Sequence, residues 1–286
     1  MIPPGPLPPT KKLTIPATAG ALYGEAFLPD NPHGIVLITH GYAEHCGRYR
    51  EVAHVIANAG WAALAYDVRG HGQSPGARGA IRRFDTYLDD LGAAHAVARK
   101  LVAPPAPLVL LGHSHGGLIT LRALCGDRPP EAAAAILSSP YLALRLKVSP
   151  FRKLLARAAS RIVPMHAQSA PLHVEALTRD VAKQAERTAD ALCFDAATAR
   201  WFTESTAAQE YVASHASRIR IPTTWLVGGD DPIADPEQTR KVAAQVPGAT
   251  YHDLAGFRHE VFNEIDRARP FQEIATTLSE HTRRPM

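Results

Sequence analysis

Leu108-Val-Leu-Leu-Gly-His-Ser114-His-Gly-Gly117 is the stretch of this 286-residue sequence that decides the fold. It places the pattern G-x-S-x-G directly after an apolar run of strand length and directly before a helix that is predicted to end near Cys125. Glycine at the two ends of the pattern leaves room where the turn brings backbone segments together. The stretch therefore predicts a nucleophile elbow, in which Ser114 projects above a helix N-terminus. A glycine-rich turn with an idle serine is the less favoured alternative.

Strand and helix patterns alternate on both sides of this turn. Short continuous apolar runs predict strands buried on both faces, and apolar residues at helical spacing predict the helices between them. Repeated strand–helix units form a mostly parallel sheet flanked by helices, so the sequence predicts the α/β class. The predicted strands are Lys12–Pro16, Ala21–Leu28, Gly34–Thr39, Trp61–Val68, Leu108–Leu111, Ala133–Leu137, Thr223–Val227 and Thr250–Leu254, and the last helical region is predicted to be interrupted at Pro270.

The alternation stops after Pro140. Residues 141–212 show helical patterns and contain no strand-like run, which predicts a helical cap (lid) inserted after the sixth strand, counting the two opening ones. We expect this cap to lie above the carboxyl ends of the strands. The core is then built from residues 1–140 and 213–286, with the proline-rich residues 1–9 as a tether.

A serine hydroxyl becomes a nucleophile only when a base removes its proton. In folds with this elbow, the acid and the histidine follow the serine in the order Ser, Asp or Glu, His. His259 lies in the loop after the last predicted strand and is the candidate base, whereas His252 lies within that strand, where alternation fixes its side chain. Asp230 and Asp231 both follow the strand before it, and spacing alone does not separate them.

A tetrahedral intermediate also needs two backbone N–H donors for its oxyanion. One comes from the residue after the nucleophile and the other from the loop after an earlier strand. These positions are His115 and Tyr42, and both would act through the main chain. Gly41 would let the loop backbone approach the substrate.

Composition excludes several other classes of protein. The chain is 46% hydrophobic and 20% charged, which is typical of a globular protein with a large core, and no apolar run approaches the length of a membrane span. Its beginning does not have the pattern of a secretory signal. The net charge of +4 comes from scattered Lys and Arg among few aromatic residues, so we expect no nucleic-acid partner.

Cysteine and histidine spacing predicts neither a disulfide framework nor a metal site. The three cysteines, Cys46, Cys125 and Cys193, are widely separated, which favours a reducing, cytoplasmic location. None of the 14 histidines forms H-E-x-x-H or pairs with cysteines at ligand spacing. Gly70–Ser74 lacks the third glycine and the helix of a dinucleotide fingerprint, so no cofactor is expected.

Four motifs together resemble the monoacylglycerol lipase and lysophospholipase branch of the α/β-hydrolases. They are His40-Gly-Tyr-Ala-Glu-His-Cys-Gly-Arg-Tyr49, Asp67-Val-Arg-Gly-His-Gly-Gln-Ser74, Gly112-His-Ser-His-Gly-Gly117 and Gly228-Gly-Asp-Asp231. The similarity runs from about residue 30 to the C-terminus and is weakest in the cap.

The resemblance implies the α/β-hydrolase fold and a serine hydrolase of fatty-acyl monoesters, with monoacylglycerol as the leading substrate. It selects Asp231 as the acid of the triad with Ser114 and His259. It also implies that Glu44 and Arg48 form the polar-head end of the pocket, and that His113 touches a glycerol hydroxyl. The chain departs from the family at His115, often methionine there, and at Tyr42, usually a small residue. A lysophospholipase or short-chain esterase is the alternative activity, and a non-catalytic lipid-binding scaffold is a remote one.

Residues 150–163 are predicted to form one helix, with Ser149 as N-cap and a stop at Pro164. One side would carry Phe151, Leu155, Ala158 and Ile162, and another Lys153, Arg157 and Arg161. From residue 141 to 173 there are six Lys or Arg and no Asp or Glu. Such a helix either lies at an anionic membrane or micelle surface, or packs its apolar side on the core.

Overall fold

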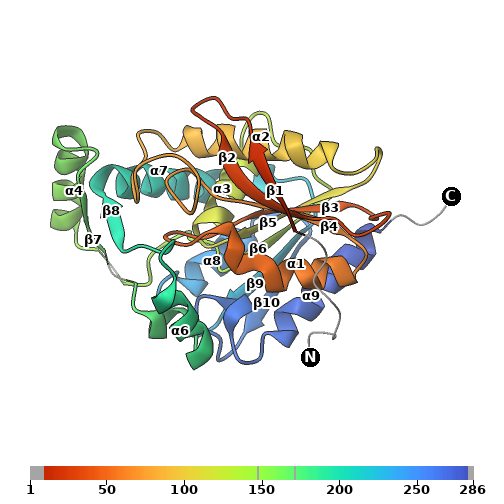
Figure 1. Cartoon of the computed structure of the whole chain (residues 1–286). Helices are drawn as coiled ribbons and strands as arrows, with labels where there is room; N and C mark the ends of the chain where they lie inside the picture. Colours follow the sequence, from red (N-terminus) through yellow and green to blue (C-terminus); the bar gives the residue numbers. More distant parts are fainter. Residues whose placement is uncertain (1–9, 147, 171, 283–286) are drawn as a thin grey trace.

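The computed structural model describes residues 10–146, 148–170 and 172–282, so the predicted tether at residues 1–9 lies outside the described residues. An eight-stranded sheet with the order β1-β2-β4-β3-β5-β6-β9-β10 forms the centre of the molecule (Figure 1). β1 and β2 are antiparallel, and the strands from β4 to β10 pair in parallel. The strands are β1 (Thr10–Ile15), β2 (Leu22–Phe27), β3 (Ile35–Thr39), β4 (Ala62–Tyr66), β5 (Leu108–His113), β6 (Ala134–Ser138), β9 (Thr223–Gly228) and β10 (Ala249–Leu254).

Helices cover both faces of this sheet, which confirms the predicted α/β architecture. Strands β3 to β6 are buried along their whole length, as their apolar sequences require. One face packs against α2 (Asp85–Lys100), α3 (His115–Leu124) and α8 (Pro236–Ala243), and the other against α1 (Arg50–Asn58) and α9 (Ala268–His281). Short 3₁₀ helices occur at Cys46–Tyr49, Ala216–Arg218 and Val261–Asn263.

The chain between β6 and β9 leaves the sheet and forms α4 (Pro150–Ile162), β7 (Ala167–Ser169), α5 (Val174–Leu177), α6 (Val181–Ala189), β8 (Ala196–Thr198) and α7 (Ala199–His215). The prediction that residues 141–212 contain no strand is wrong, because β7 and β8 pair antiparallel. Each strand is only three residues long, and β7 is exposed throughout, so neither carries an apolar alternation that a sequence pattern could reveal.

The C-terminal helix also differs from its prediction. Pro270 does not interrupt it, because α9 begins at Ala268 and the proline occupies its first turn. The first backbone N–H groups of a helix have no intrahelical partner, so proline costs little there.

Helix α4 begins at Pro150, after an N-cap bond from the Arg152 N–H to the Ser149 hydroxyl, as the sequence predicts, and ends at Ile162, one residue before the predicted end. It packs on α7 and stands at the edge of the molecule in Figure 1. Among the α4 side chains that the structure describes, Ser160 is the buried one, and it bonds to Thr203 of α7 at 2.8 Å. The apolar side chains point outward: Phe151 is 67% exposed and Ile162 79%.

Those exposures contradict the alternative in which α4 packs its apolar side on the core. The side chain of Lys153 lies outside the described residues. Among the described residues, no helix combines the length and hydropathy needed to span a bilayer.

Candidate active site

Ser114 sits at the sharp turn between β5 and α3, as the G-x-S-x-G pattern predicts. Its φ of 49° and ψ of −114° lie outside the usual regions for an L-residue. A side chain at Gly112 would come within 2.7 Å of the Gly116 carbonyl oxygen, and one at Gly116 would overlap the Thr39 carbonyl. Gly112 is therefore required for β5 to pack against the first turn of α3, and Gly116 for that turn to lie against the end of β3.

Ser114, His259 and Asp231 form one hydrogen-bonded chain at the carboxyl end of the sheet. Nδ1 of His259 donates to the Asp231 carboxylate at 2.7 Å, and Nε2 of His259 lies 2.8 Å from Oγ of Ser114. With Nδ1 protonated, Nε2 is the nitrogen that can accept the serine proton. The other Asp231 oxygen accepts from the N–H groups of Ile233 and Ala234, which fixes the carboxylate.

The charges around the Ser114–His259–Asp231 hydrogen bonds favour a protonated His259. Burial alone would lower the pKa of His259, but the charge and hydrogen bond of Asp231, together with Glu260 and Glu44, outweigh burial and raise that pKa above its ordinary value. Ser114, His259 and Asp231 are all buried. An imidazolium formed here is thus stabilised where little water screens it.

The alternative acid and base lie elsewhere. Asp230 is exposed, and only its backbone N–H is engaged, with the carbonyl of Phe257 at 3.0 Å. His252 lies on β10, and its ring is 3.6 Å from Glu273 of α9. The structure brings Asp231 and His259 to Ser114, and neither rival.

The loop after β3 lies directly against the nucleophile. A side chain at Gly41 would come within 3.3 Å of the Ser114 Cβ and 2.8 Å of Glu44, so only glycine lets this backbone pass. The Gly41 N–H donates to Glu44 at 2.6 Å, which holds the loop in place. Tyr42 follows in this loop and His115 opens α3, and their rings are 6.0 Å apart. Tyr42 thus follows the glycine that lies against Ser114, and His115 follows Ser114 itself.

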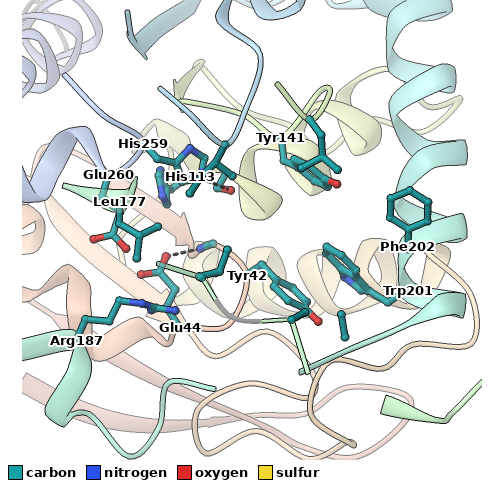
Figure 2. A pocket seen from close by; sticks show the side chains of 17 residues that line it. Tyr42, Glu44, His113, Tyr141, Leu177, Arg187, Trp201, Phe202, His259 and Glu260 are labelled. Carbon is teal, nitrogen blue, oxygen red and sulfur yellow. Dashed lines mark hydrogen bonds between the residues drawn. The ribbon is translucent and has the colours of Figure 1, made fainter. Parts of the chain in front are cut away.

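A cavity of about 340 Å³ opens beside Ser114 and His259. Figure 2 shows its two unlike ends: rings of Tyr42, Tyr141, Trp201 and Phe202 on one side, and Glu44, Arg187 and Glu260 on the other. Most of the other lining residues are aliphatic: Leu144, Ala170, Leu172, Leu177, Ala197 and Ile233. The reacting serine therefore lies between an apolar arm and a polar end.

Residues 30–266 match the family model described as serine aminopeptidase, S33. The chain belongs to this family. This S33 hydrolase is 30% identical to phospholipase YtpA of Bacillus subtilis, over 85% of this chain and 94% of the relative. It is 28% identical to a monoacylglycerol lipase of Mycolicibacterium smegmatis, over 90% and 92% of the two chains. A crystal structure of Paleococcus ferrophilus monoacylglycerol lipase superposes with a TM-score of 0.82 at 29% identity, over 91% of this chain and 99% of that one.

These relatives and the observed topology establish the α/β-hydrolase fold and the serine hydrolase class for this chain. The roles of individual residues are argued from the geometry of the site.

The polar end of the S33 hydrolase cavity is an ion-pair cluster. Arg48 donates to Glu44 at 3.0 Å and to Glu260 at 2.7 Å, and Glu44 also accepts from the Tyr49 hydroxyl at 2.8 Å. Burial would raise the pKa of Glu44, but the Arg48 charge, His113 and His40 hold it well below its usual range. The structure thus pairs the predicted Glu44 with Arg48, but of these two Glu44 lines the cavity, whereas Arg48 lines a small pocket beside it. Glu260, which adjoins His259, also lines the cavity, and sequence reasoning missed it.

His113, predicted to touch a glycerol hydroxyl, lines the cavity beside this cluster. Its Nδ1 lies 2.9 Å from the Ser138 hydroxyl, and its ring centroid is 5.1 Å from that of His259. Burial, and then the charge of His259, lower the pKa of His113 to about 4. A neutral imidazole here can exchange hydrogen bonds with a substrate hydroxyl.

Arg187 is a second residue that the sequence did not reveal. It comes from α6, is buried, and lines the polar end of the cavity. Its guanidinium donates to the Ala43 carbonyl and to Cys193 Sγ, each at 3.3 Å. No motif marks it, because only the fold of residues 141–212 brings it to the site.

One group of possible metal ligands occurs in the described part of the chain: His45, Asp190 and Cys193. Nε2 of His45 lies 2.7 Å from Asp190, while its Nδ1 accepts from the Gly47 N–H. The ring is therefore a donor toward Asp190, and its Nε2 lone pair is not available to a cation in this arrangement. Sequence spacing could not suggest this group, because His45 is far from Asp190 and Cys193 in the chain.

Proposed function

We propose that this S33 hydrolase cleaves fatty-acyl monoesters, with a monoacylglycerol as its substrate. The observation that carries the proposal is the position of Ser114 between an apolar arm and a polar end. Ser114 attacks the acyl carbonyl as His259 takes its proton, and Asp231 holds the imidazole tautomer. The N–H groups of Tyr42 and His115 stabilise the oxyanion. His259 then protonates the leaving alcohol, and water hydrolyses the acyl-enzyme.

The polar end supports a neutral, hydroxylated leaving group. Two carboxylates, Glu44 and Glu260, and the Arg187 guanidinium line it, and Arg48, which pairs with both carboxylates, brings the sum of the formal charges to zero. A glycerol moiety can exchange hydrogen bonds there without altering this balance, whereas a phosphate would add charge beside Glu44. Lysophospholipid hydrolysis is the second candidate, because one relative at 30% identity is named a phospholipase.

Peptide hydrolysis is disfavoured despite the name of the family model. An aminopeptidase needs an acceptor for the substrate ammonium group, and both cavity carboxylates are already paired with Arg48. Hydrolysis of monoacylglycerols but not of amino-acyl nitroanilides would support the ester assignment. A non-catalytic scaffold would leave Ser114 unlabelled by a fluorophosphonate probe.

The catalytic efficiency kcat/KM is expected to rise with acyl length until the apolar arm is full, and then to fall. Each methylene that enters the arm contributes at most about 0.8 kcal/mol, or about fourfold in kcat/KM. We propose that residues 141–212 act as the cap that encloses this arm. A series of monoacylglycerols and nitrophenyl esters of increasing chain length measures the profile. A flat profile from acetyl to long acyl esters would indicate an open-cleft esterase instead.

We also propose that α4 docks on an anionic lipid surface and presents the cavity to it. Phe151, Leu154 and Ile162 are each more than 60% exposed, and Arg152, Arg157 and Arg161 are exposed beside them. Inserted apolar side chains and basic residues near anionic headgroups both favour binding. Together with the three unpaired cysteines, this supports a cytoplasmic location with peripheral membrane association.

Cosedimentation with vesicles tests this docking. Binding to vesicles that contain phosphatidylserine is expected at low salt and should weaken as salt screens the arginines. Arg157→Glu with Arg161→Glu should reduce binding at least tenfold, since each basic residue contributes about 1 kcal/mol. Arg82→Glu with Arg128→Glu, which changes the same charge at exposed sites outside α4, is the matched control. The absence of binding to anionic vesicles at low salt would refute the proposal.

A further inference from the structure

The side chain of Tyr42 packs against the segment Phe194–Trp201, which follows α6. Its hydroxyl donates to the Ala196 carbonyl of β8 at 2.6 Å. Its ring lies 3.9 Å from the Trp201 ring of α7, with 31° between the planes, and 5.6 Å from Phe194. Figure 2 shows Tyr42 and Trp201 side by side in the cavity wall. One residue thus joins the loop beside Ser114 to the segment Phe194–Trp201.

The second proposed oxyanion donor reaches the same cluster. The His115 ring lies 5.4 Å from Trp201 and 6.0 Å from Tyr42. Its other ring neighbours are Phe84 and Tyr87. Trp201 therefore contacts the side chains of both residues whose N–H groups face the reacting carbonyl in the proposed mechanism.

The backbone around Tyr42 is held from the same side. The Phe194 N–H donates to the Ala43 carbonyl at 3.3 Å, and Arg187 donates to that carbonyl as well. The Thr198 N–H donates to the Gly79 carbonyl at 2.9 Å, and a side chain at Gly79 would come within 2.7 Å of the Tyr42 hydroxyl. The loop is thus held by a main-chain bond from Phe194, and the segment Phe194–Trp201 is itself tied to the loop that contains Gly79.

We propose that Tyr42 is a positioning residue through which the segment Phe194–Trp201 sets the geometry of the oxyanion hole. The proposal rests on the ester hydrolysis proposed above. Oxyanion donors act only when they lie within about 3 Å of the developing charge, and loss of one donor costs about 10²–10³ in kcat. A loop that shifts because its tether is lost weakens such a donor without removing it.

Tyr42→Phe removes the bond to Ala196 and keeps the ring, whereas Tyr42→Ala removes both and keeps the N–H. With nitrophenyl acetate, whose acyl group is too short to fill the apolar arm, kcat should fall about tenfold in Tyr42→Phe and about a hundredfold in Tyr42→Ala. KM should change little. Affinity for a short trifluoromethyl ketone, which forms an oxyanion on Ser114, should fall in parallel with kcat/KM.

The matched control is Tyr211, on α7 but outside the cavity, where its ring stacks on His215 and its hydroxyl accepts from Arg218. Tyr211→Phe and Tyr211→Ala should lower thermal stability at most and leave kcat for the acetate ester unchanged. If Tyr42→Ala does not fold, Tyr42→Phe carries the test.

Unchanged kcat and unchanged ketone affinity in the folded Tyr42 variants would overturn the proposal. A loss confined to KM for long acyl esters would also overturn it, because Tyr42 would then only line the cavity. Failure of the wild-type protein to cleave monoacylglycerols, with nitrophenyl acetate still cleaved, would refute the proposed substrate and leave the Tyr42 comparison valid.

Discussion

Replacing Ser114 with alanine is expected to abolish ester hydrolysis, by at least about 10⁴-fold in kcat, while the protein stays folded. The serine oxygen is the only atom that the change removes, and the alanine methyl group fits where Cβ already lies. Hydrolysis of a nitrophenyl ester measures the loss, and thermal unfolding checks the fold. Reaction with a fluorophosphonate probe should disappear with it.

His259→Ala should come close to the same loss, because Oγ of Ser114 and Nε2 of His259, 2.8 Å apart, act on one proton. Groups that act as a unit are not additive, so the double variant should be hardly slower than either single variant. Losses that multiply in the double variant would show that the two residues act independently, and would remove His259 as the base.

Asp231→Asn is the second large expected effect, at about 10⁴-fold in kcat. An amide presents either a donor or a neutral acceptor to Nδ1, so it no longer selects the tautomer that leaves Nε2 able to accept the Ser114 proton. Asp230→Asn is the matched control, since the neighbouring carboxylate is exposed and should change kcat little. A crippling effect of Asp230→Asn with a mild one of Asp231→Asn would reverse the assignment of the acid.

The pH profile gives an independent check on Asp231. His259 acts as a base only when neutral, so activity should fall as the pH drops through its pKa, which is raised above the ordinary value. The Asp231 charge is the main group that raises this pKa, so Asp231→Asn should move the acidic limb of its residual activity to lower pH. An acidic limb that stays in place would mean that another group sets it.

The sequence located each strand of the large sheet within the described residues. Strands β3 to β6 are the clearest, because strands buried on both faces appear as continuous apolar runs. It also located Ser114 and His259, whose positions follow from the elbow and from the order of the chain. These features are local: each depends on a few neighbouring residues and on one parallel sheet.

Features that depend on distant contacts could not be predicted from local patterns. Spacing did not separate Asp230 from Asp231; burial and the bond to His259 do. Glu260 and Arg187 have no motif, because their roles arise from contacts with residues far away in the chain. The sequence also left undecided whether the apolar side of α4 faces the core or points outward, because an amphipathic helix does not reveal which surface its apolar residues meet.

The exposed apolar side of α4 also favours self-association when no lipid is present. In bulk water Phe151, Leu154, Leu155 and Ile162 remain hydrated, and the same side of a second molecule is a surface of equal hydrophobicity. Two copies related by a two-fold axis can shield both surfaces at once. Self-association and lipid attachment then compete for the same residues, and mass action decides between them. The number of copies per particle is therefore expected to vary with protein concentration and to fall when detergent or vesicles are added.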